Sequence, residues 1–193
     1  MSLLFDEPLI AGLEYRDDFI AENEQAALVV RLDALDLAPF RFHGWLGNRK
    51  TRTFGWRYDF DDASFAPTDP IPDWLMPLRD RAARLARCEP DDFAHVLLAR
   101  YDPGAGIGWH RDRPQFEDVV GISLGSAATM RFRQRTPTGF RRANVNLAPR
   151  SAYLLSGEVR HDWEHSIVPG ETLRFSITFR TLSDKGKQLA AAA

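Results

Sequence analysis

Two histidines and one aspartate in this sequence have the types and spacing of a mononuclear metal site. His110 and Asp112 form an H-x-D pair, and His165 follows later in the chain. Residues two apart in a β-strand point to the same face, so His110 and Asp112 can face one ion while Arg111 faces away. Two imidazoles and one carboxylate form the facial ligand set of non-haem Fe(II), which leaves positions open for O2 and a bidentate ligand. An H-x-D pair by itself fits a surface turn equally well.

A second pattern of charged residues lies between Arg174 and Arg180. Alternation predicts a strand there, with one polar face and one apolar face (Arg174, Ser176, Thr178, Arg180; Phe175, Ile177, Phe179). Two inward-facing arginines need anions, because a buried guanidinium without a partner loses its hydration. A dicarboxylate cosubstrate would supply both partners. The strand alone favours the simpler interpretation, in which the arginines face solvent and pair with surface acids.

The elements that must position these residues are two helices followed by about eight short strands. Apolar residues at helical spacing predict one helix over 20–36 and another after Pro72 that ends near Cys88. From Phe93 onward, short apolar or alternating runs are separated by Gly, Pro and Asn, which is typical of antiparallel β-structure. The predicted strands cover 95–101, 108–111, 119–124, 128–134, 144–147, 152–156, 163–168 and 172–182. This order predicts a double-sheet β-fold flanked by helices.

Four stretches, taken in order, have the spacing of a known enzyme family. They are ARYDPG at 99–104 leading through Ile107 to His110 and Asp112, VGISLG at 120–125, SG at 156–157 with Arg160, Trp163, His165 and Ile167, and 174–180. In these stretches the chain resembles the AlkB-like family of Fe(II)/2-oxoglutarate-dependent dioxygenases. The resemblance covers most of the chain. It implies an α+β fold, a double-stranded β-helix (distorted jelly roll) flanked by N-terminal helices, in a single domain over 1–193.

The resemblance also implies roles for individual residues. Tyr101 and Arg174 would bind the distal carboxylate of 2-oxoglutarate, and Arg180 would lie near its metal-chelating end. Ser176 would add a further contact to this cosubstrate. The implied catalytic residues and iron ligands are His110, Asp112 and His165.

Three positions depart from the family pattern. Ala99 and Ser176 stand where family members often have Asn, so one polar contact to the cosubstrate is lost and another is shortened. After the H-x-D pair this chain has Arg113 and Pro114, where the founding members place another acid near the base pocket. The first two departures affect cosubstrate affinity, and the third bears on whether the substrate is a damaged base.

Residues 41–60 alternate aromatic side chains with Arg and Gly and look like the family's substrate-covering lid. Aromatic rings for stacking and cations for phosphate are what a flipped-base binder needs. A structural strand whose aromatics cover the core fits the pattern equally well. The candidate substrate-binding residues in this segment are Arg49, Lys50, Phe54, Trp56 and Tyr58.

A second basic patch consists of Arg131, Arg133 and Arg135, which share one face of a predicted strand with Phe132 opposite. These arginines could track a phosphate backbone, or they could protect the exposed edge of a sheet by charge. We expect this patch and the basic residues of 41–60 to flank one cleft and to contact a polyanion.

Composition restricts the class of protein but not its substrate. The 193 residues carry a formal net charge of −2, which argues against a uniformly basic nucleic-acid binder. The charge is nevertheless uneven, because 131–150 contains six Arg and no acid. The single cysteine cannot form an internal disulfide, and the chain has no apolar run long enough to span a bilayer. We expect a cytoplasmic monomer with no membrane contact.

The resemblance implies an oxygenase that uses Fe(II), 2-oxoglutarate and molecular oxygen. The expected reaction is hydroxylation of an N-linked methyl group on a nucleobase of DNA or RNA, which then loses formaldehyde. A relative that acts on modified tRNA or on protein side chains would share the same iron and cosubstrate residues. A nucleic-acid binding module with a degenerate site would not need the complete triad. A metal-only cupin-type enzyme would leave the paired arginines unexplained.

Overall fold

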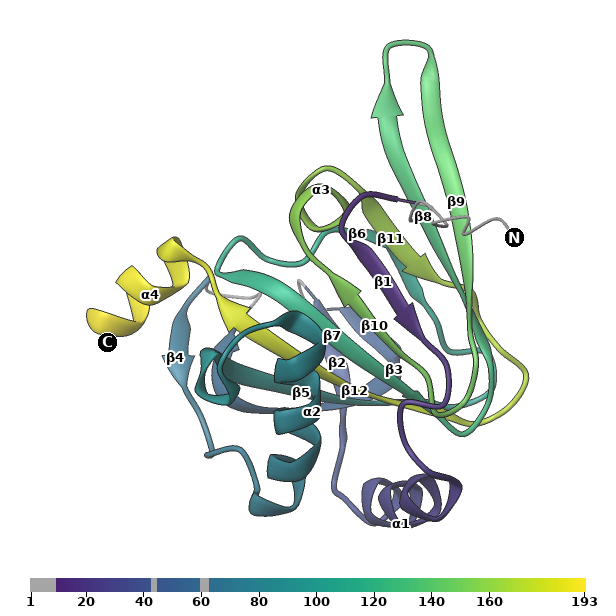
Figure 1. The fold of residues 1–193 in the computed structure, drawn as a ribbon, viewed down its shortest axis with the longest axis vertical. Coiled ribbons are helices and arrows are strands. Elements are labelled where there is room, and N and C mark those ends of the chain that lie inside the picture. The colour runs from purple at the N-terminus through teal and green to yellow at the C-terminus, as the bar shows by residue number, and fades with distance from the viewer. Residues whose placement is uncertain (1–9, 43–44, 60–62) are drawn as a thin grey trace, which may run out of the picture.

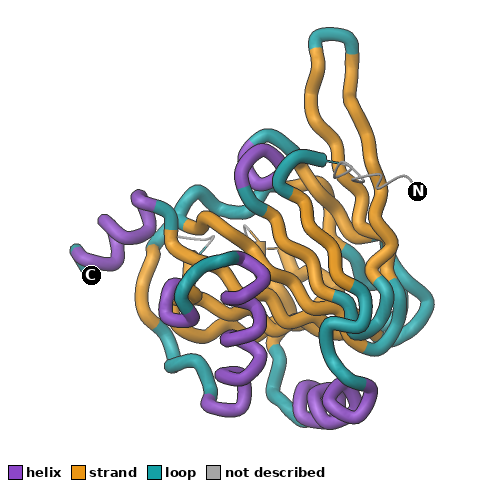
Figure 2. Tube along the Cα trace, in the orientation of Figure 1, coloured by secondary structure: helices purple, strands orange, loops and turns teal. Residues whose placement is uncertain are grey.

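The computed structural model describes residues 10–42, 45–59 and 63–193, which form two antiparallel β-sheets and four α-helices (Figure 1, Figure 2). The strands of the major sheet are β1 (Leu13–Arg16), β2 (Ala38–Phe42), β3 (Trp45–Tyr58), β4 (Phe65–Pro67), β5 (Phe93–Tyr101), β7 (Phe116–Leu124), β10 (Ala152–Leu155) and β12 (Arg174–Leu182). Those of the minor sheet are β6 (Ile107–His110), β8 (Ala128–Thr136), β9 (Gly139–Leu147) and β11 (Glu164–Ile167). The helices are α1 (Glu22–Asp33), α2 (Met76–Ala86), α3 (Gly157–His161) and α4 (Asp184–Ala191).

The two sheets have the strand orders of a jelly roll. The major sheet runs β1-β10-β7-β12-β5-β3-β2, with β4 paired to β3, and the minor sheet runs β6-β11-β8-β9. Strand β12 lies in the middle of the major sheet, between β5 and β7. The predicted α+β double-stranded β-helix with N-terminal helices is therefore confirmed.

Two apolar clusters hold the layers together. The first joins α1 and α2 to the outer face of the major sheet, where it buries residues such as Leu32, Leu78 and Ile177. The second lies between the two sheets and includes Met130 and Phe132 from β8. Because side chains alternate along a strand, the polar residues of β12 face the space between the sheets while its apolar residues face the helices. As a result of this alternation, polar side chains of β12 line the interior of the jelly roll.

The observed elements differ from the predicted ones in length and in number, and α1 is shorter than the predicted 20–36. Strand β9 begins at Gly139, whereas only 144–147 was expected, because its first residues are mostly exposed and show no apolar alternation. The short elements β1, β4 and α3 were not expected, since three to five residues give too little periodicity to recognise. None of the helices in the described residues is long and apolar enough to cross a bilayer.

The described part of 41–60 is continuous with the major sheet. It belongs to β2 and β3, and β3 pairs with β5 over most of that strand's length. These strands therefore form an edge of the sheet beside the interior of the jelly roll. Whether this edge covers a substrate stays a prediction.

We predict that Gly121→Ala destabilises the fold. Gly121 pairs with Tyr153 across β7 and β10, and an added Cβ would lie 2.2 Å from Tyr153 Cζ. Overpacking of this kind costs about 1–3 kcal/mol. Urea denaturation should show this loss in the free energy of unfolding. The matched control Gly170→Ala, at an exposed position with its nearest atom 4.0 Å away, should change it by less than about 0.5 kcal/mol. Equal stability of the two variants would contradict the packing argument.

Candidate metal and cosubstrate site

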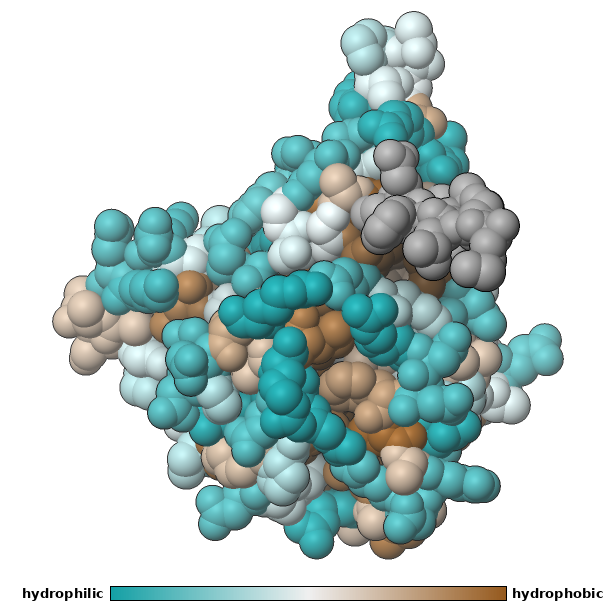
Figure 3. Space-filling view, viewed as in Figure 1, coloured by the Kyte–Doolittle hydropathy of each residue, from teal (hydrophilic) through white to brown (hydrophobic). Residues whose placement is uncertain are grey.

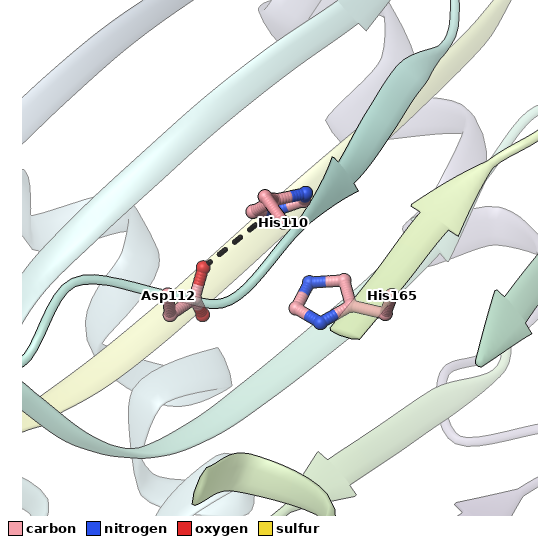
Figure 4. Close-up of side chains that lie close together, drawn as sticks. All are labelled: His110, Asp112 and His165. Carbon is pink, nitrogen blue, oxygen red and sulfur yellow. Dashed lines mark ion pairs between the residues drawn. The ribbon is translucent and has the colours of Figure 1, made fainter. Parts of the chain in front are cut away.

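The three predicted metal ligands come together at one end of the minor sheet. Strands β6 and β11 pair in a register that places His110 directly opposite His165. Asp112 follows two residues after His110 and turns towards the same space (Figure 4). One ligand atom from each of the three residues lies within 4.8 Å of the other two. This spacing fits coordination of a single ion.

Hydrogen bonding orients the first imidazole. His110 Nδ1 lies 2.9 Å from the carbonyl oxygen of Gly108, while Nε2 faces Asp112 Oδ1 at 3.8 Å. If Nδ1 carries the proton and donates it to this carbonyl, Nε2 keeps its lone pair for a metal. The His165 ring lies with its centroid 4.3 Å from that of His110 and packs against Phe132.

The protonation states of the triad also suit a divalent cation. Burial lowers the pKa of His110, and burial together with the charge of His110 lowers the pKa of His165 to about 3. Burial alone would raise the pKa of Asp112, but Arg180 and the two histidines outweigh it and lower that pKa. Near neutral pH the site therefore offers two neutral imidazoles and one carboxylate, which is the form that binds metal.

Arg180 forms an ion pair with the carboxylate of Asp112. Its Nε lies 3.2 Å from Asp112 Oδ2 and its Nη2 lies 3.3 Å from Asp112 Oδ1, which is a bidentate pair. Its Nη1 lies 3.5 Å from Nδ1 of the buried His95. Arg180 is thus placed beside the metal ligands, and its contact with the cosubstrate stays a prediction.

A buried arginine further along β12 lacks a partner for part of its guanidinium. Arg174 is 4% exposed, and its Nε donates to Ser123 Oγ at 3.1 Å. Its Nη1 is buried with no hydrogen-bond partner among the described residues. Arg174 Cζ lies 4.7 Å from the centre of the Tyr101 ring, and both residues line a small cavity with Ile167. A carboxylate bound there would satisfy this donor, which fits the distal end of 2-oxoglutarate.

The sequence did not assign a role to Arg160, which ties the Asp112 loop to α3. This arginine is 5% exposed and donates to the carbonyl oxygens of Arg113, Phe116 and Glu117 at 2.8, 2.5 and 2.7 Å. It thereby fixes the backbone that follows Asp112. No local sequence signal marks such a role, because the partners are backbone atoms distant in the chain.

Comparisons with known proteins agree with this geometry. Residues 12–180 match the model of the 2OG-Fe(II) oxygenase superfamily. The chain belongs to this superfamily. The oxygenase is 28% identical over 172 residues to the mouse (Mus musculus) protein named tRNA (carboxymethyluridine(34)-5-O)-methyltransferase ALKBH8, with 84% of this chain and 25% of that protein covered. It is 29% identical over 119 residues to the zebrafish (Danio rerio) probable RNA/DNA demethylase ALKBH6, with 61% and 48% covered.

Solved structures share the fold at low sequence identity. The structure of OsALKBH1 superposes with a TM-score of 0.68 at 15% identity and covers 91% of this chain and all (100%) of that chain. A prolyl-4-hydroxylase from Pseudomonas putida gives a TM-score of 0.59 at 13% identity, with 89% and 93% covered. The resemblance to AlkB-like dioxygenases is therefore confirmed. The chain spans about a quarter of the length of the mouse relative, so that protein's activity is not transferred to it.

The family and the triad imply Fe(II) and 2-oxoglutarate as cofactors of this dioxygenase. Such a centre supplies oxidative decarboxylation of 2-oxoglutarate by O2, coupled to hydroxylation of a carbon in the substrate. The triad would hold the metal, while Arg180 keeps Asp112 ionised and oriented and Arg160 fixes the backbone that follows Asp112.

The proposed substrate residues on β3 divide between the two faces of the sheet. Phe54 is 4% exposed and packs in the cluster beneath the helices, so the expectation that it contacts substrate is wrong. Lys50 lies on the same outer face and pairs with Asp102 at 3.4 Å. By alternation, Arg49 faces the interior instead. The two faces could not be told apart from sequence, because the register of β3 on β5 decides which residues face inward.

Beyond Gly55, the last aromatics of β3 lie close to the Asp112 loop. Trp56 stacks on Phe65 with ring centroids 5.1 Å apart, and Phe65 contacts Phe116. The Tyr58 ring lies 4.7 Å from Arg113 Cζ. Tyr58 is therefore near the residue that follows the metal ligand, and its contact with substrate stays a prediction.

Arg131 and Arg133 lie on the outer face of the minor sheet. They flank the Trp109 ring at 5.0 and 4.5 Å, and Arg133 pairs with Glu164 at 2.6 Å. Trp109 and Glu164 each neighbour a ligand histidine in the chain and so point away from the metal. The expectation that these arginines and those of β3 flank one cleft is wrong, since Arg131, Arg133 and Lys50 all face away from the interior.

We predict that His110→Ala, Asp112→Ala and His165→Ala each abolish Fe(II) retention and turnover while leaving the fold intact. Removal of one ligand from a three-ligand site destroys its geometry. Metal content after dialysis and succinate release at saturating Fe(II) measure the effect. The control is His161→Ala, an exposed histidine on α3 that pairs with Glu117 and should behave like the wild type. Wild-type turnover in any two of the ligand variants would refute the assignment.

We also predict that the metal-free protein loses stability in acid through His95. Burial and the charge of Arg180 lower the pKa of His95 well below 6.5, so the folded chain keeps it neutral while the unfolded chain takes up a proton. Because the folded pKa is the lower one, this contribution is complete above pH 6.5 and declines below it.

Between pH 7.5 and 5.5 the loss amounts to about 1.4 kcal/mol from this histidine. Urea denaturation with a chelator at both pH values measures it. In His95→Gln the decrease in the free energy of unfolding should be smaller by this amount. The same decrease in both proteins would contradict the prediction.

Proposed function

We propose that this dioxygenase oxidises an N-linked alkyl group on a nucleobase within a polynucleotide. The family chemistry supports the oxidation. The observation that supports a polynucleotide substrate is an arginine-rich arm. The end of β8 and the start of β9 form this arm, which projects from the body of the protein (Figure 1). We call this segment, residues 134–142, the hairpin arm.

The hairpin arm extends past the metal end of the minor sheet. Strand β11 begins at Glu164, which pairs with Arg133, so the residues of β8 beyond Arg133 pair only with β9. His165 is the next residue of β11, and it carries the metal site. The arm therefore projects beyond the metal end, where a bound strand would continue on either side of a target base.

The surface of the arm suits phosphate groups and exposed bases. Arg135, Arg141 and Arg142 are exposed, and no acid occurs between 131 and 150. Arg135 and Arg142 lie 5.8 and 5.4 Å from the centre of the Phe140 ring. In Figure 3 the arm is largely hydrophilic or neutral. Arginines around an aromatic ring bind single strands through phosphate charge and base stacking.

Arg113, the residue that follows Asp112, affects which kind of modified base the site would accept. Arg113 stands where the resemblance would place an acid, so the carboxylate that would stabilise a cationic base is missing at this position. A cationic base such as 3-methylcytosine would lose that stabilisation, whereas neutral 3-methyluracil needs no such partner. We therefore propose a neutral modified base as the target. The relatives' names refer to tRNA and to RNA/DNA, so both polynucleotides belong in the test.

The deciding assay measures succinate and formaldehyde together. Matched single-stranded RNA and DNA oligonucleotides carry 3-methylcytosine, a neutral methylated base (3-methyluracil in RNA, 3-methylthymine in DNA) or no modification. A methylated peptide tests the alternative of a protein substrate. We expect formaldehyde only with a modified oligonucleotide, and more with the neutral base. Turnover with the peptide alone would overturn the nucleobase proposal in favour of protein side chains. Equal turnover of cationic and neutral bases would overturn the charge argument.

We predict that the hairpin arm accounts for much of the affinity for oligonucleotides. The triple variant Arg135→Gln, Arg141→Gln, Arg142→Gln should bind more weakly, and each lost phosphate contact should reduce the slope of log affinity against log salt by about 0.7–0.9. A control with the same charge change, Arg84→Gln, Lys185→Gln, Lys187→Gln, alters exposed cations on α2 and α4 and should keep the wild-type slope. If the arm variant keeps the wild-type slope of log affinity against log salt, the hairpin arm does not contact phosphate groups.

A further inference from the structure

Arg49 lies in a row of inward-facing residues that crosses three strands. The register pairs Arg49 of β3 with Tyr101 of β5, and Tyr101 with Arg174 of β12. Residues directly opposite each other in neighbouring strands share a face, with their Cβ atoms about 5 Å apart. The hydroxyl-bearing ring of Tyr101 is therefore flanked by one guanidinium on each side.

The outward-facing cations on these strands have acidic partners, whereas the inward-facing pair does not. Lys50 pairs with Asp102 at 3.4 Å, and Arg52 pairs with Asp69 at 3.3 Å. Arg100 contacts both Asp33 and Asp102. Within the described residues, no carboxylate lies within ion-pair distance of Arg49 or Arg174. Two guanidinium groups that flank a buried tyrosine on one face of the sheet, without a carboxylate, form a site for an anion.

A second observation indicates where the anion lies. The buried Nη1 of Arg174 has no hydrogen-bond partner among the described residues, and Arg174 with Tyr101 lines the small cavity between the sheets. Arg49 is held in place by the Phe40 ring, with Cζ 4.1 Å from the ring centre. The unpartnered donor of Arg174 thus lies beside Tyr101, and the guanidinium of Arg49 hydrogen-bonds to the Tyr101 side chain.

We propose that Arg49 is a second guanidinium ligand for the distal carboxylate of 2-oxoglutarate, opposite Arg174 and with the Tyr101 hydroxyl between them. This role differs from the phosphate contact that the sequence suggested for Arg49. It rests on the cosubstrate of the family and is independent of the proposed nucleobase substrate.

The neighbouring side chains explain why a second arginine is needed. Ala99 offers no polar group, and Ser176, which pairs with it across β5 and β12, offers only a hydroxyl. The donors for a carboxylate must therefore come from elsewhere on this face, and Arg49 is the cation that β3 supplies. Burial raises the pKa of Tyr101, but the charges of Arg49 and Arg174 and hydrogen bonds from Ser176 and Arg49 outweigh it and lower that pKa. A more acidic hydroxyl is a stronger donor to a carboxylate.

The test compares two cosubstrates that differ in the distal carboxylate. Binding of 2-oxoglutarate and of 2-oxopentanoate, in which a methyl group replaces that carboxylate, is measured without O2 by calorimetry on the Mn(II)-loaded protein. A charge-assisted hydrogen bond contributes about 1.5–3 kcal/mol, so Arg49→Gln should weaken 2-oxoglutarate binding by about 10- to 150-fold. Binding of 2-oxopentanoate should change by less than about twofold.

Two further variants keep the result interpretable. Lys50→Gln removes the neighbouring cation on the opposite face and should bind both compounds like the wild type. Arg49→Lys keeps the charge without the planar fork and should give an intermediate loss for 2-oxoglutarate. If Arg49→Gln fails to fold, Arg49→Lys carries the test alone.

The outcomes separate the alternatives. An equal loss for both compounds would show that Arg49 only supports the architecture of the site, and unchanged binding of 2-oxoglutarate would show that Arg49 does not contact the cosubstrate. Either result would overturn the proposal. Because no polynucleotide is present, neither result would bear on the nucleobase proposal.

Discussion

The alternation of side chains along β12 is the constraint on which the rest of the structure depends. Its apolar residues close the core beneath α1 and α2, and its polar residues face the space between the sheets. Because β12 lies in the middle of the major sheet, its register fixes the neighbouring strands on both sides. One strand thus places Arg174 beside Tyr101 and Arg180 beside Asp112, so the core and the site cannot shift independently.

The interior cations differ in whether the protein supplies an anion for them. Arg180 is satisfied by Asp112, and that pairing keeps the carboxylate ionised for a metal. Arg174 and Arg49 have no carboxylate partner among the described residues, and for the buried Arg174 that cost is tolerated where a ligand supplies the missing charge. The protein thus supplies its own acid at the metal end, and in our proposal the cosubstrate supplies the acid at the other.

Sequence reasoning succeeded where periodicity alone determines geometry. The face shared by Arg174 and Arg180 follows from a period of two in β12, and the structure confirms that the triad comes together. Strand β6 ends at His110, so Asp112 lies in the loop that follows and is oriented by Arg180 and not by strand alternation. Sequence reasoning failed where the result depends on contacts between distant segments. Whether Phe54 or Arg49 faces inward is set by the pairing of β3 with β5, and the role of Arg160 depends on backbone carbonyls more than forty residues away.

Contacts between distant segments also separate two groups of arginines that look alike in sequence, those that face the interior and those of the hairpin arm. Arg180 faces the interior and meets the buried carboxylate of Asp112, so this pairing is little screened by salt. The arginines of the hairpin arm are exposed, and Arg135 and Arg142 lie near the Phe140 ring, in a part of β8 and β9 that no third strand covers. Contacts made there are adaptable and depend on ionic strength. The cosubstrate contacts that we propose thus lie on central strands of the sheet, whereas the polynucleotide surface that we propose can vary without disturbing the metal site.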